Sequence, residues 1–341
     1  MGIDNQGTEI EDAVVAIGPW VYNTAVGAPR TGYGRGSMCV NATDPSAVLP
    51  YPFTAAKTTF GATASFYFAG TSSSPWTQNN LPFFIFASSG SGCLALATTT
   101  TTGEIKLVRW TGAAYTTIAT GAVPSTNTAI RFDVYVENYG AGDATERCRV
   151  WLRYPLAATP PVLWIDYSGD LTSPAITDLD AAWITPVAAT TASTAGISEV
   201  IICDEPTLRM GVVPIYPNAA GDATEWTGAY TAIDELAASM TDFIETPDAV
   251  KLFLCNVTDL PAGSLNPLCL KVSILAAKGS SGPTQIKIAI KTHGTVYYSS
   301  TFALDISPTA YSYSWPLNPN TTAAWTTAEI TALQIGVESV A

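Results

Sequence analysis

Charged residues are scarce in this chain, and basic residues most of all. Asp, Glu, Lys and Arg make up 13% of the 341 residues, about half of the usual fraction. The 15 Lys and Arg are outnumbered by 28 Asp and Glu, which leaves a net charge of −13. Such a surface repels phosphate backbones and anionic lipid headgroups. We therefore expect neither nucleic acid nor a membrane as a partner.

The chain has a single histidine and no cysteine pair with the spacing of a metal site. His293 is the single histidine, so a serine–histidine–aspartate triad has one candidate base, and no nucleophile-elbow motif supplies its partner. Its place after an alternating segment and before Gly294 predicts the tip of a hairpin. The six cysteines form no CxxC pair, and we expect them to be reduced and buried. The sequence thus predicts a protein that is not an enzyme and holds no metal or cofactor.

Targeting signals and long apolar runs are missing as well. The first residues include Asp4, Glu9, Glu11 and Asp12 but no Lys or Arg, whereas a secretory signal begins with a basic region. No stretch approaches the roughly 18 uninterrupted apolar residues of a membrane-spanning helix. We therefore expect no secretory signal and no transmembrane segment.

Short segments with alternating polar and apolar residues are what the chain has in abundance. Residues 130–137, 147–153 and 285–291 each place apolar side chains on one face and charged side chains on the other. Clusters of Gly, Ser, Asp and Pro separate such segments. This pattern is typical of antiparallel strands with one wet face, and it predicts a sandwich or jelly roll. The clearest helical signal is short: Thr326 and Glu329 fit a capping box.

Proline positions suggest how the chain is divided. Pro214 and Pro217 interrupt an apolar stretch, which is typical of a stiff linker or an edge. We predict an all-β fold with two antiparallel, jelly-roll-like β-sandwich domains, at residues 51–212 and 213–341. Residues 1–50 contain four prolines and little patterning, so we predict an irregular N-terminal arm that orders when it docks on a partner.

The hexamer AGDATE occurs twice, at residues 141–146 and 220–225. The flanking residues do not match, so the repeat does not indicate a duplicated domain. We expect the two copies to share the same hairpin turn.

Carboxylates cluster near the middle of the chain and offer a candidate calcium site. Calcium binds several oxygen ligands, which loops of a β-sandwich can supply. Solvated turns and caps explain the same residues, and paired carboxylates also serve glycosidases. Because the turn interpretation suffices, we expect no tight metal site. The candidate ligands are Asp166, Asp170, Asp178 and Asp180.

Aromatic residues offer a candidate sugar-binding site. The chain has nine tryptophans and fifteen tyrosines, and aromatic rings stack on sugar rings. Core packing and subunit contacts are the alternative explanation. The tryptophans that the sequence nominates for glycan stacking are Trp76, Trp110 and Trp151.

Two stretches resemble parts of tailed-bacteriophage structural proteins. The first runs from about residue 53 to 210 and carries the markers 93–96, 103–107, 131–137, 164–171 and 198–205. It resembles a laminin-G/concanavalin-like jelly roll. The second runs from residue 216 to 341 and carries the markers 219–228, 233–235 and 324–336. It is similar to a C-terminal β-sandwich that follows such jelly rolls in virion proteins.

The resemblance implies a non-enzymatic virion protein. It would be a capsid-decoration, head-fibre or tail-associated subunit, assembled in the host cytoplasm. Its partners would be capsid or tail subunits and further copies of itself, for example in a trimer. Two other functions stay open: a carbohydrate-binding adhesin that recognises a host surface glycan, and a glycoside-processing enzyme with a jelly-roll fold.

Overall fold

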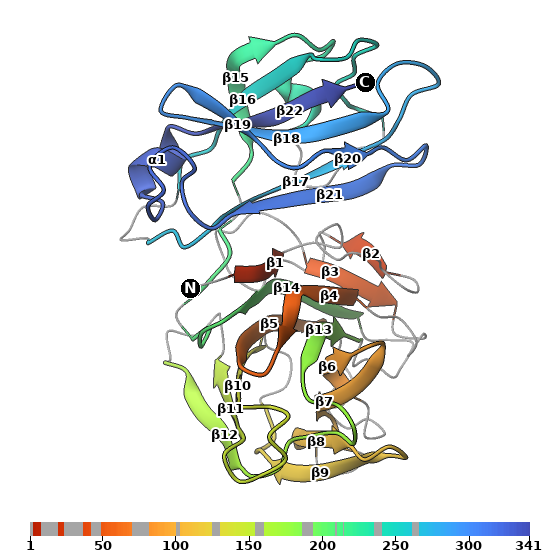
Figure 1. Ribbon diagram of the computed structural model, residues 1–341, viewed down its shortest axis with the longest axis vertical. Coiled ribbons are helices and arrows are strands. Elements are labelled where there is room, and N and C mark those ends of the chain that lie inside the picture. The colour runs from red at the N-terminus through yellow and green to blue at the C-terminus, as the bar shows by residue number, and fades with distance from the viewer. Residues whose placement is uncertain are drawn as a thin grey trace. The chain divides into compact units, whose positions relative to one another are not determined.

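The computed structural model shows two compact units, Met1–Val212 and Val213–Ala341 (Figure 1). Every strand pairing is antiparallel in the part of the chain that the structure describes, so the predicted all-β fold with antiparallel sandwiches is confirmed. Within that part, no helix has the length and apolarity to span a membrane. The structure describes residues 3–7, 20–23, 37–41, 49–69, 82–99, 103–124, 130–153, 160–185, 194–208, 210–213, 215–234, 241–260 and 266–341.

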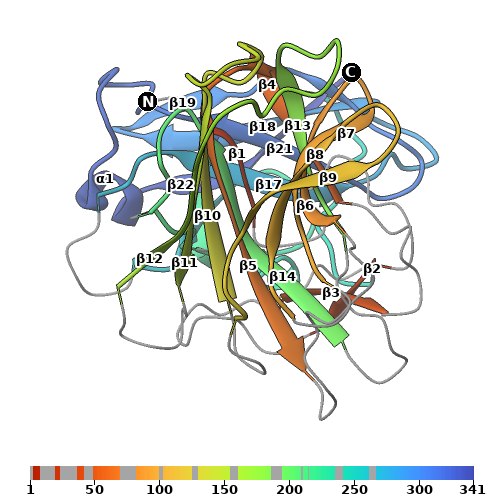
Figure 2. The same cartoon turned by 90° about the horizontal axis from the view of Figure 1, so that it is seen from below.

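The first unit packs an eight-stranded sheet against a six-stranded sheet. The larger sheet has the order β12-β11-β10-β5-β14-β3-β2, with β1 also paired to β14, and Figure 2 shows β11, β10, β5 and β14 side by side. Its strands are β1 (Ile3–Gly7), β2 (Trp20–Asn23), β3 (Ser37–Asn41), β5 (Phe60–Ala69), β10 (Ile130–Glu137), β11 (Arg147–Arg153), β12 (Val162–Ser168) and β14 (Thr194–Cys203).

The smaller sheet of this unit has the order β4-β13-β6-β7-β8-β9. Its strands are β4 (Leu49–Lys57), β6 (Pro82–Ser88), β7 (Ser91–Ala97), β8 (Lys106–Trp110), β9 (Tyr115–Thr120) and β13 (Leu179–Ile184). Aromatic side chains from both sheets fill the space between them. The Phe66 ring meets the Phe83 ring edge to face at 5.2 Å, and the Phe132 ring lies 5.8 Å from Phe66. Burying each such ring contributes about 1.5–3 kcal/mol.

Residues 1–50 were predicted to form an irregular arm, but the structure has three short strands in this segment. They contain β1, β2 and β3, which pair with β14 or with each other. These strands are four or five residues long, and β1 reads IDNQG. Such segments are too short to show the sustained alternation on which strand prediction depends.

The second unit pairs a six-stranded sheet with a two-stranded one. The larger sheet has the order β15-β16-β22-β18-β19, with β20 on β18, and the smaller is β17-β21. The elements are β15 (Pro217–Thr224), η3 (Tyr230–Ala232), β16 (Leu252–Val257), β17 (Leu270–Ala276), β18 (Gln285–Thr292), β19 (Thr295–Tyr298), β20 (Phe302–Ala303), β21 (Thr309–Trp315), α1 (Thr327–Thr331) and β22 (Gln334–Val340).

Two tryptophans and one short helix close the core of the second unit. Trp315 and Trp325 are buried with Ile288 and Ile290, and Trp325 Nε1 donates to the Trp315 carbonyl at 2.8 Å. Helix α1 begins at the predicted capping box, in which Thr326 caps the helix and the side chain of its third residue reaches back. The apolar face of β18 therefore packs under both the small sheet and α1.

The two copies of AGDATE adopt different structures, so the prediction of a shared hairpin turn is wrong. Residues 141–146 form the loop between β10 and β11, whereas residues 220–225 lie mostly in β15. At Gly221 an added Cβ would come within 2.7 Å of the Leu254 backbone. The partner strand β16 thus holds the second copy extended, and six residues alone do not decide the conformation.

Candidate functional site

The structure places on different sheets the two described tryptophans that the sequence nominates for glycan stacking. Trp151 lies on β11 of the large sheet and Trp110 ends β8 of the small sheet. The Trp110 ring packs edge to face against Tyr115 at 5.2 Å. Trp76 lies outside the described residues. Trp151 is half-buried and lies between Arg149 and Arg153 on the same face of β11.

Trp151 belongs to a polar layer on the outer side of β10, β11 and β12. Alternation directs Phe132, Val134 and Val150 into the core, so the residues between them point outward. The register places Asp133 opposite Trp151. We call this outer layer the arginine–aromatic face, and it consists of Arg131, Asp133, Tyr135, Glu137, Arg147, Arg149, Trp151, Arg153, Leu163 and Asp166.

Arg149 is held at the centre of the arginine–aromatic face by two rings. Its guanidinium carbon lies 5.3 Å from the Tyr135 ring centre and 5.5 Å from the Trp151 ring centre, within the range of cation–π attraction. Its Nη2 donates to Glu137 Oε2 at 2.7 Å. Burial, followed by the charge of Glu137, raises the pKa of Tyr135, so its hydroxyl stays protonated at neutral pH and can donate a hydrogen bond.

Arg147 and Asp166 form a second fixed pair on this face. Arg147 Nε and Nη2 reach the two carboxylate oxygens of Asp166 at 2.8 and 2.6 Å. These hydrogen bonds hold the pKa of Asp166 below its ordinary value. Both side chains are thereby oriented before any ligand arrives.

The four candidate calcium ligands are not brought together. Asp166 is engaged by Arg147, Asp170 pairs with Arg109, and Asp180 accepts a hydrogen bond from the Ser89 backbone at 2.8 Å. Asp178 lies in the loop before β13. Across the described residues, no group of three or more His, Cys, Asp or Glu side chains has the arrangement of a metal site.

One end of the arginine–aromatic face is buried, which differs from the predicted wet face. Arg131 and Asp133 are 0% and 1% exposed. Arg131 Nη2 donates to Asp133 Oδ1 at 2.7 Å and to the Thr207 carbonyl at 2.8 Å, and Thr207 Oγ1 donates to the same carboxylate at 2.7 Å. Thr207 is more than seventy residues away in the chain, so alternation within β10 could not reveal this cover.

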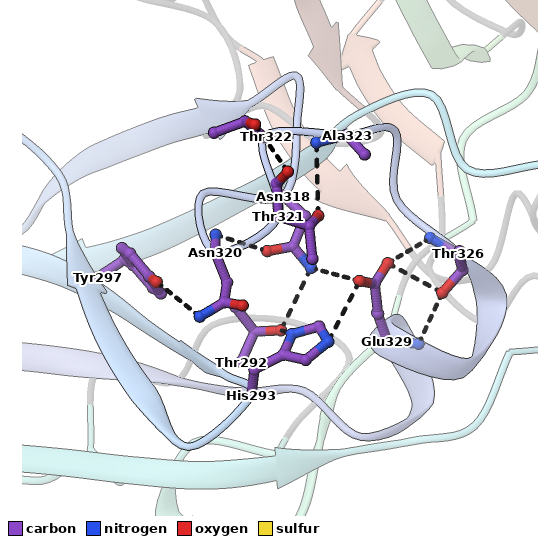
Figure 3. Close-up of polar contacts among 10 residues, drawn as sticks. All are labelled: Thr292, His293, Tyr297, Asn318, Asn320, Thr321, Thr322, Ala323, Thr326 and Glu329. Atoms are coloured by element: carbon purple, nitrogen blue, oxygen red, sulfur yellow. Dashed lines mark hydrogen bonds and ion pairs between the residues drawn. The ribbon is translucent and has the colours of Figure 1, made fainter.

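The second unit has a polar cluster at the tip of the β18–β19 hairpin (Figure 3). His293 and Gly294 have φ angles of 51° and 77°, the left-handed geometry that a two-residue hairpin turn favours. His293 Nδ1 lies 3.1 Å from Thr292 Oγ1, and Nε2 lies 3.6 Å from Glu329 Oε1. Asn318 Nδ2 donates to the same Glu329 oxygen at 2.8 Å.

A hydroxyl, an imidazole and a carboxylate follow one another in this cluster, as they do in a catalytic triad. Their geometry instead suits a structural role, in which they hold neighbouring segments together. Thr292 is 4% exposed, so a substrate cannot reach its hydroxyl. The other Glu329 oxygen accepts hydrogen bonds from the Thr326 backbone at 2.8 Å and its hydroxyl at 2.9 Å. Glu329 therefore ties the start of α1 to Asn318 and the hairpin tip.

Acid should loosen this cluster. Hydrogen bonds from Thr326 hold the pKa of Glu329 below its ordinary value of 4.5. A depressed pKa in the folded state means that the stabilisation is present above 4.5 and is lost as pH falls through the folded value. We expect Glu329→Gln to increase local opening of residues 316–333 at pH 6, and this increase should shrink as the pH is lowered step by step below 4.5, as measured by hydrogen exchange corrected for intrinsic rates. An increase that stays the same at every pH down to acid unfolding would contradict this assignment.

Comparisons with known proteins give weak matches to solved structures. No protein-family model and no curated protein matches the sequence. An alginate lyase Aly36B variant in complex with alginate tetrasaccharide is 10% identical, with 50% of this chain and 82% of that chain covered and a TM-score of 0.37. Metal-free lectin I-B4 from Griffonia simplicifolia is 13% identical, with 56% of this chain and 93% of that chain covered and a TM-score of 0.38. The VIP36 exoplasmic/lumenal domain in its Ca2+/Man-bound form is 10% identical, with 56% of this chain and 82% of that chain covered and a TM-score of 0.39.

Proposed function

We propose that the first unit binds carbohydrate through its arginine–aromatic face. The observation that carries this proposal is the placement of Trp151 beside Arg149 and the fixed carboxylate of Glu137 on the half-buried outer surface of β10 and β11. An aromatic ring covers the apolar side of a sugar, while neighbouring charged groups bind its hydroxyls.

The face has the rigidity that sugar binding requires. Its polar groups sit on strands β10, β11 and β12, and the ion pairs of Arg147 with Asp166 and of Arg149 with Glu137 fix their directions. Leu163 lies opposite Trp151 on β12 and is 47% exposed, which extends the apolar contact. Preorganised groups lose little conformational entropy when a ligand binds.

Trp151→Ala should remove most of the glycan affinity of the full chain. Truncating a central aromatic contact commonly costs about 2 kcal/mol or more, which corresponds to binding weaker by at least about tenfold. A glycan array followed by titration calorimetry with the best ligand measures the effect. The matched control is Trp110→Ala, which removes the same side chain from the other sheet and should leave affinity unchanged.

Equal losses in both variants, or binding by Trp151→Ala at the wild-type level, would overturn the assignment of the face. A wild-type chain that binds no glycan on the array would overturn the proposed function itself.

A virion role is a second proposal, and it concerns assembly rather than glycan recognition. It is motivated by the resemblance to phage structural proteins and by exposed apolar side chains on the second unit. Phe243, Val250 and Ile306 are 56%, 74% and 82% exposed, and covering them at an interface would remove apolar surface from water. The chain should then copurify with phage particles at a fixed copy number, and its absence from purified particles would refute the role.

A further inference from the structure

We infer that the arginine–aromatic face selects glycans that carry a carboxylate; this inference rests on the proposed function. The chain carries a net charge of −13 and only 15 basic residues, yet four arginines occupy two neighbouring strands of this face. Arg131, Arg147, Arg149 and Arg153 face the carboxylates of Asp133, Glu137 and Asp166, and the charge of Glu205 also acts on Tyr135. The face is therefore near neutral, whereas the whole molecule is strongly negative.

Hydrogen-bond donors exceed acceptors on this face. Arg149 has five N–H donors, and its one hydrogen bond within the described part of the chain goes from Nη2 to Glu137. Arg149 Nε and Arg131 Nη1 are buried without an acceptor among the described residues, so a ligand cannot reach either atom. The donors of Arg149 that remain for a ligand are on Nη1, which makes no hydrogen bond within the described part of the chain. An ionised carboxylate only accepts hydrogen bonds and therefore suits such donors.

Geometry makes Arg149 the residue that would bind this carboxylate. The Tyr135 and Trp151 rings fix the plane of its guanidinium, and its side chain is 25% exposed. A planar guanidinium with free donors binds a carboxylate through parallel hydrogen bonds. Arg147 already binds both oxygens of Asp166 through Nε and Nη2, which leaves its Nη1, and Arg131 is fully buried. Among these three arginines, Arg149 is the one that lies over the Tyr135 and Trp151 rings.

The proposed contact places the sugar ring and its charge side by side. A sugar ring over Trp151 and Leu163 would lie next to the Arg149 guanidinium, because Arg149 is two residues from Trp151 on the same face of β11. A carboxylate attached directly to that ring would reach the guanidinium without a long linker. Uronic acids and sialic acids carry their carboxylates in this way.

The test compares each acidic glycan with its own neutral form. The probes are sialylated and uronate-containing oligosaccharides and the methyl ester of each, together with sulfated glycans, all titrated against the full chain. We expect the free acids to bind about tenfold or more tightly than their esters, because a hydrogen bond to a charged group contributes that much. Added salt should reduce the difference.

Variants then locate the preference. Arg149→Gln should bind acid and ester alike, at about the affinity that the wild-type chain has for the ester. The matched control is Arg109→Gln, since Arg109 is also ion-paired and is 27% exposed but lies on β8 in the other sheet; it should keep the preference. Thermal melting of each variant shows that it is folded.

Three results would overturn the carboxylate preference. Equal affinity of the wild-type chain for acids and esters overturns the carboxylate preference and leaves the proposed function standing, and this arm requires no variant to fold. Tighter binding of sulfated glycans than of carboxylated ones also overturns it, as does an unchanged preference in Arg149→Gln. Failure to bind any of these probes overturns the inference, whereas the proposed function falls only if the wild-type chain binds no glycan on the array.

Discussion

Asp133→Ala should destabilise the first unit by about 3–5 kcal/mol, the usual cost of removing one partner from a buried ion pair. Arg131 and Asp133 are buried between β10 and the segment that carries Thr207. Without the carboxylate, the Arg131 guanidinium loses its counter-charge and the Thr207 hydroxyl loses its acceptor. Denaturant unfolding of the full chain, followed by hydrogen exchange in β5 and β10, measures the loss.

A double variant separates the cost of an orphaned charge from the net value of the pair. Arg131→Met with Asp133→Leu replaces the pair by apolar side chains of similar size, and it should be within about 2 kcal/mol of the wild-type chain. A double variant that is as unstable as Asp133→Ala would show that the pair itself, rather than the unpaired arginine, determines the loss.

Glu146→Ala should be the second large destabilisation, of about 3 kcal/mol, because two backbone N–H groups lose a charged acceptor in a buried place. The Glu146 side chain is 0% exposed. Its Oε1 accepts from the Gly142 backbone at 2.7 Å and from the Thr172 hydroxyl, and its Oε2 accepts from the Leu171 backbone. This carboxylate therefore joins the β10–β11 loop to the segment after β12.

The repeated hexamer supplies a matched control for Glu146. Glu225 ends the second AGDATE copy and is exposed, although its Oε2 also accepts from a backbone N–H, that of Leu252, at 2.8 Å. Glu225→Ala should cost about 0.5 kcal/mol or less. The free energy of unfolding of both variants, from denaturant titration, tests the difference. Similar losses would contradict the claim that burial makes Glu146 important.

Local signals account for the features that the sequence predicted. The alternation in residues 130–137 and 285–291 corresponds to strands β10 and β18, because side-chain direction repeats every second residue. Gly294 and the capping residue Thr326 mark a hairpin tip and a helix start. In each of these places, the chemistry that decides the structure lies within a few residues of chain.

Long-range contacts account for what the sequence did not show. Thr207 buries one end of a face whose alternation predicts exposure, and the short strand β3 depends on pairing with β14. The alternating pattern of residues 147–153 indicated charged side chains that face outward. It did not indicate that the Arg149 guanidinium would lie over the Tyr135 and Trp151 rings. Of the residues on this face, the sequence nominated Trp151 for glycan stacking and Asp166 as a calcium ligand, and it did not nominate Arg149.

A hydrogen-exchange footprint of the full chain tests the central claim, that β10–β12 form the glycan-binding face. The chain would be compared with and without a saturating carboxylated oligosaccharide selected from the array. We predict slower exchange confined to peptides within residues 130–168, with no change in residues 285–333 around the hairpin-tip cluster. Protection confined to the second unit, or to β6–β9 of the first, would contradict the account.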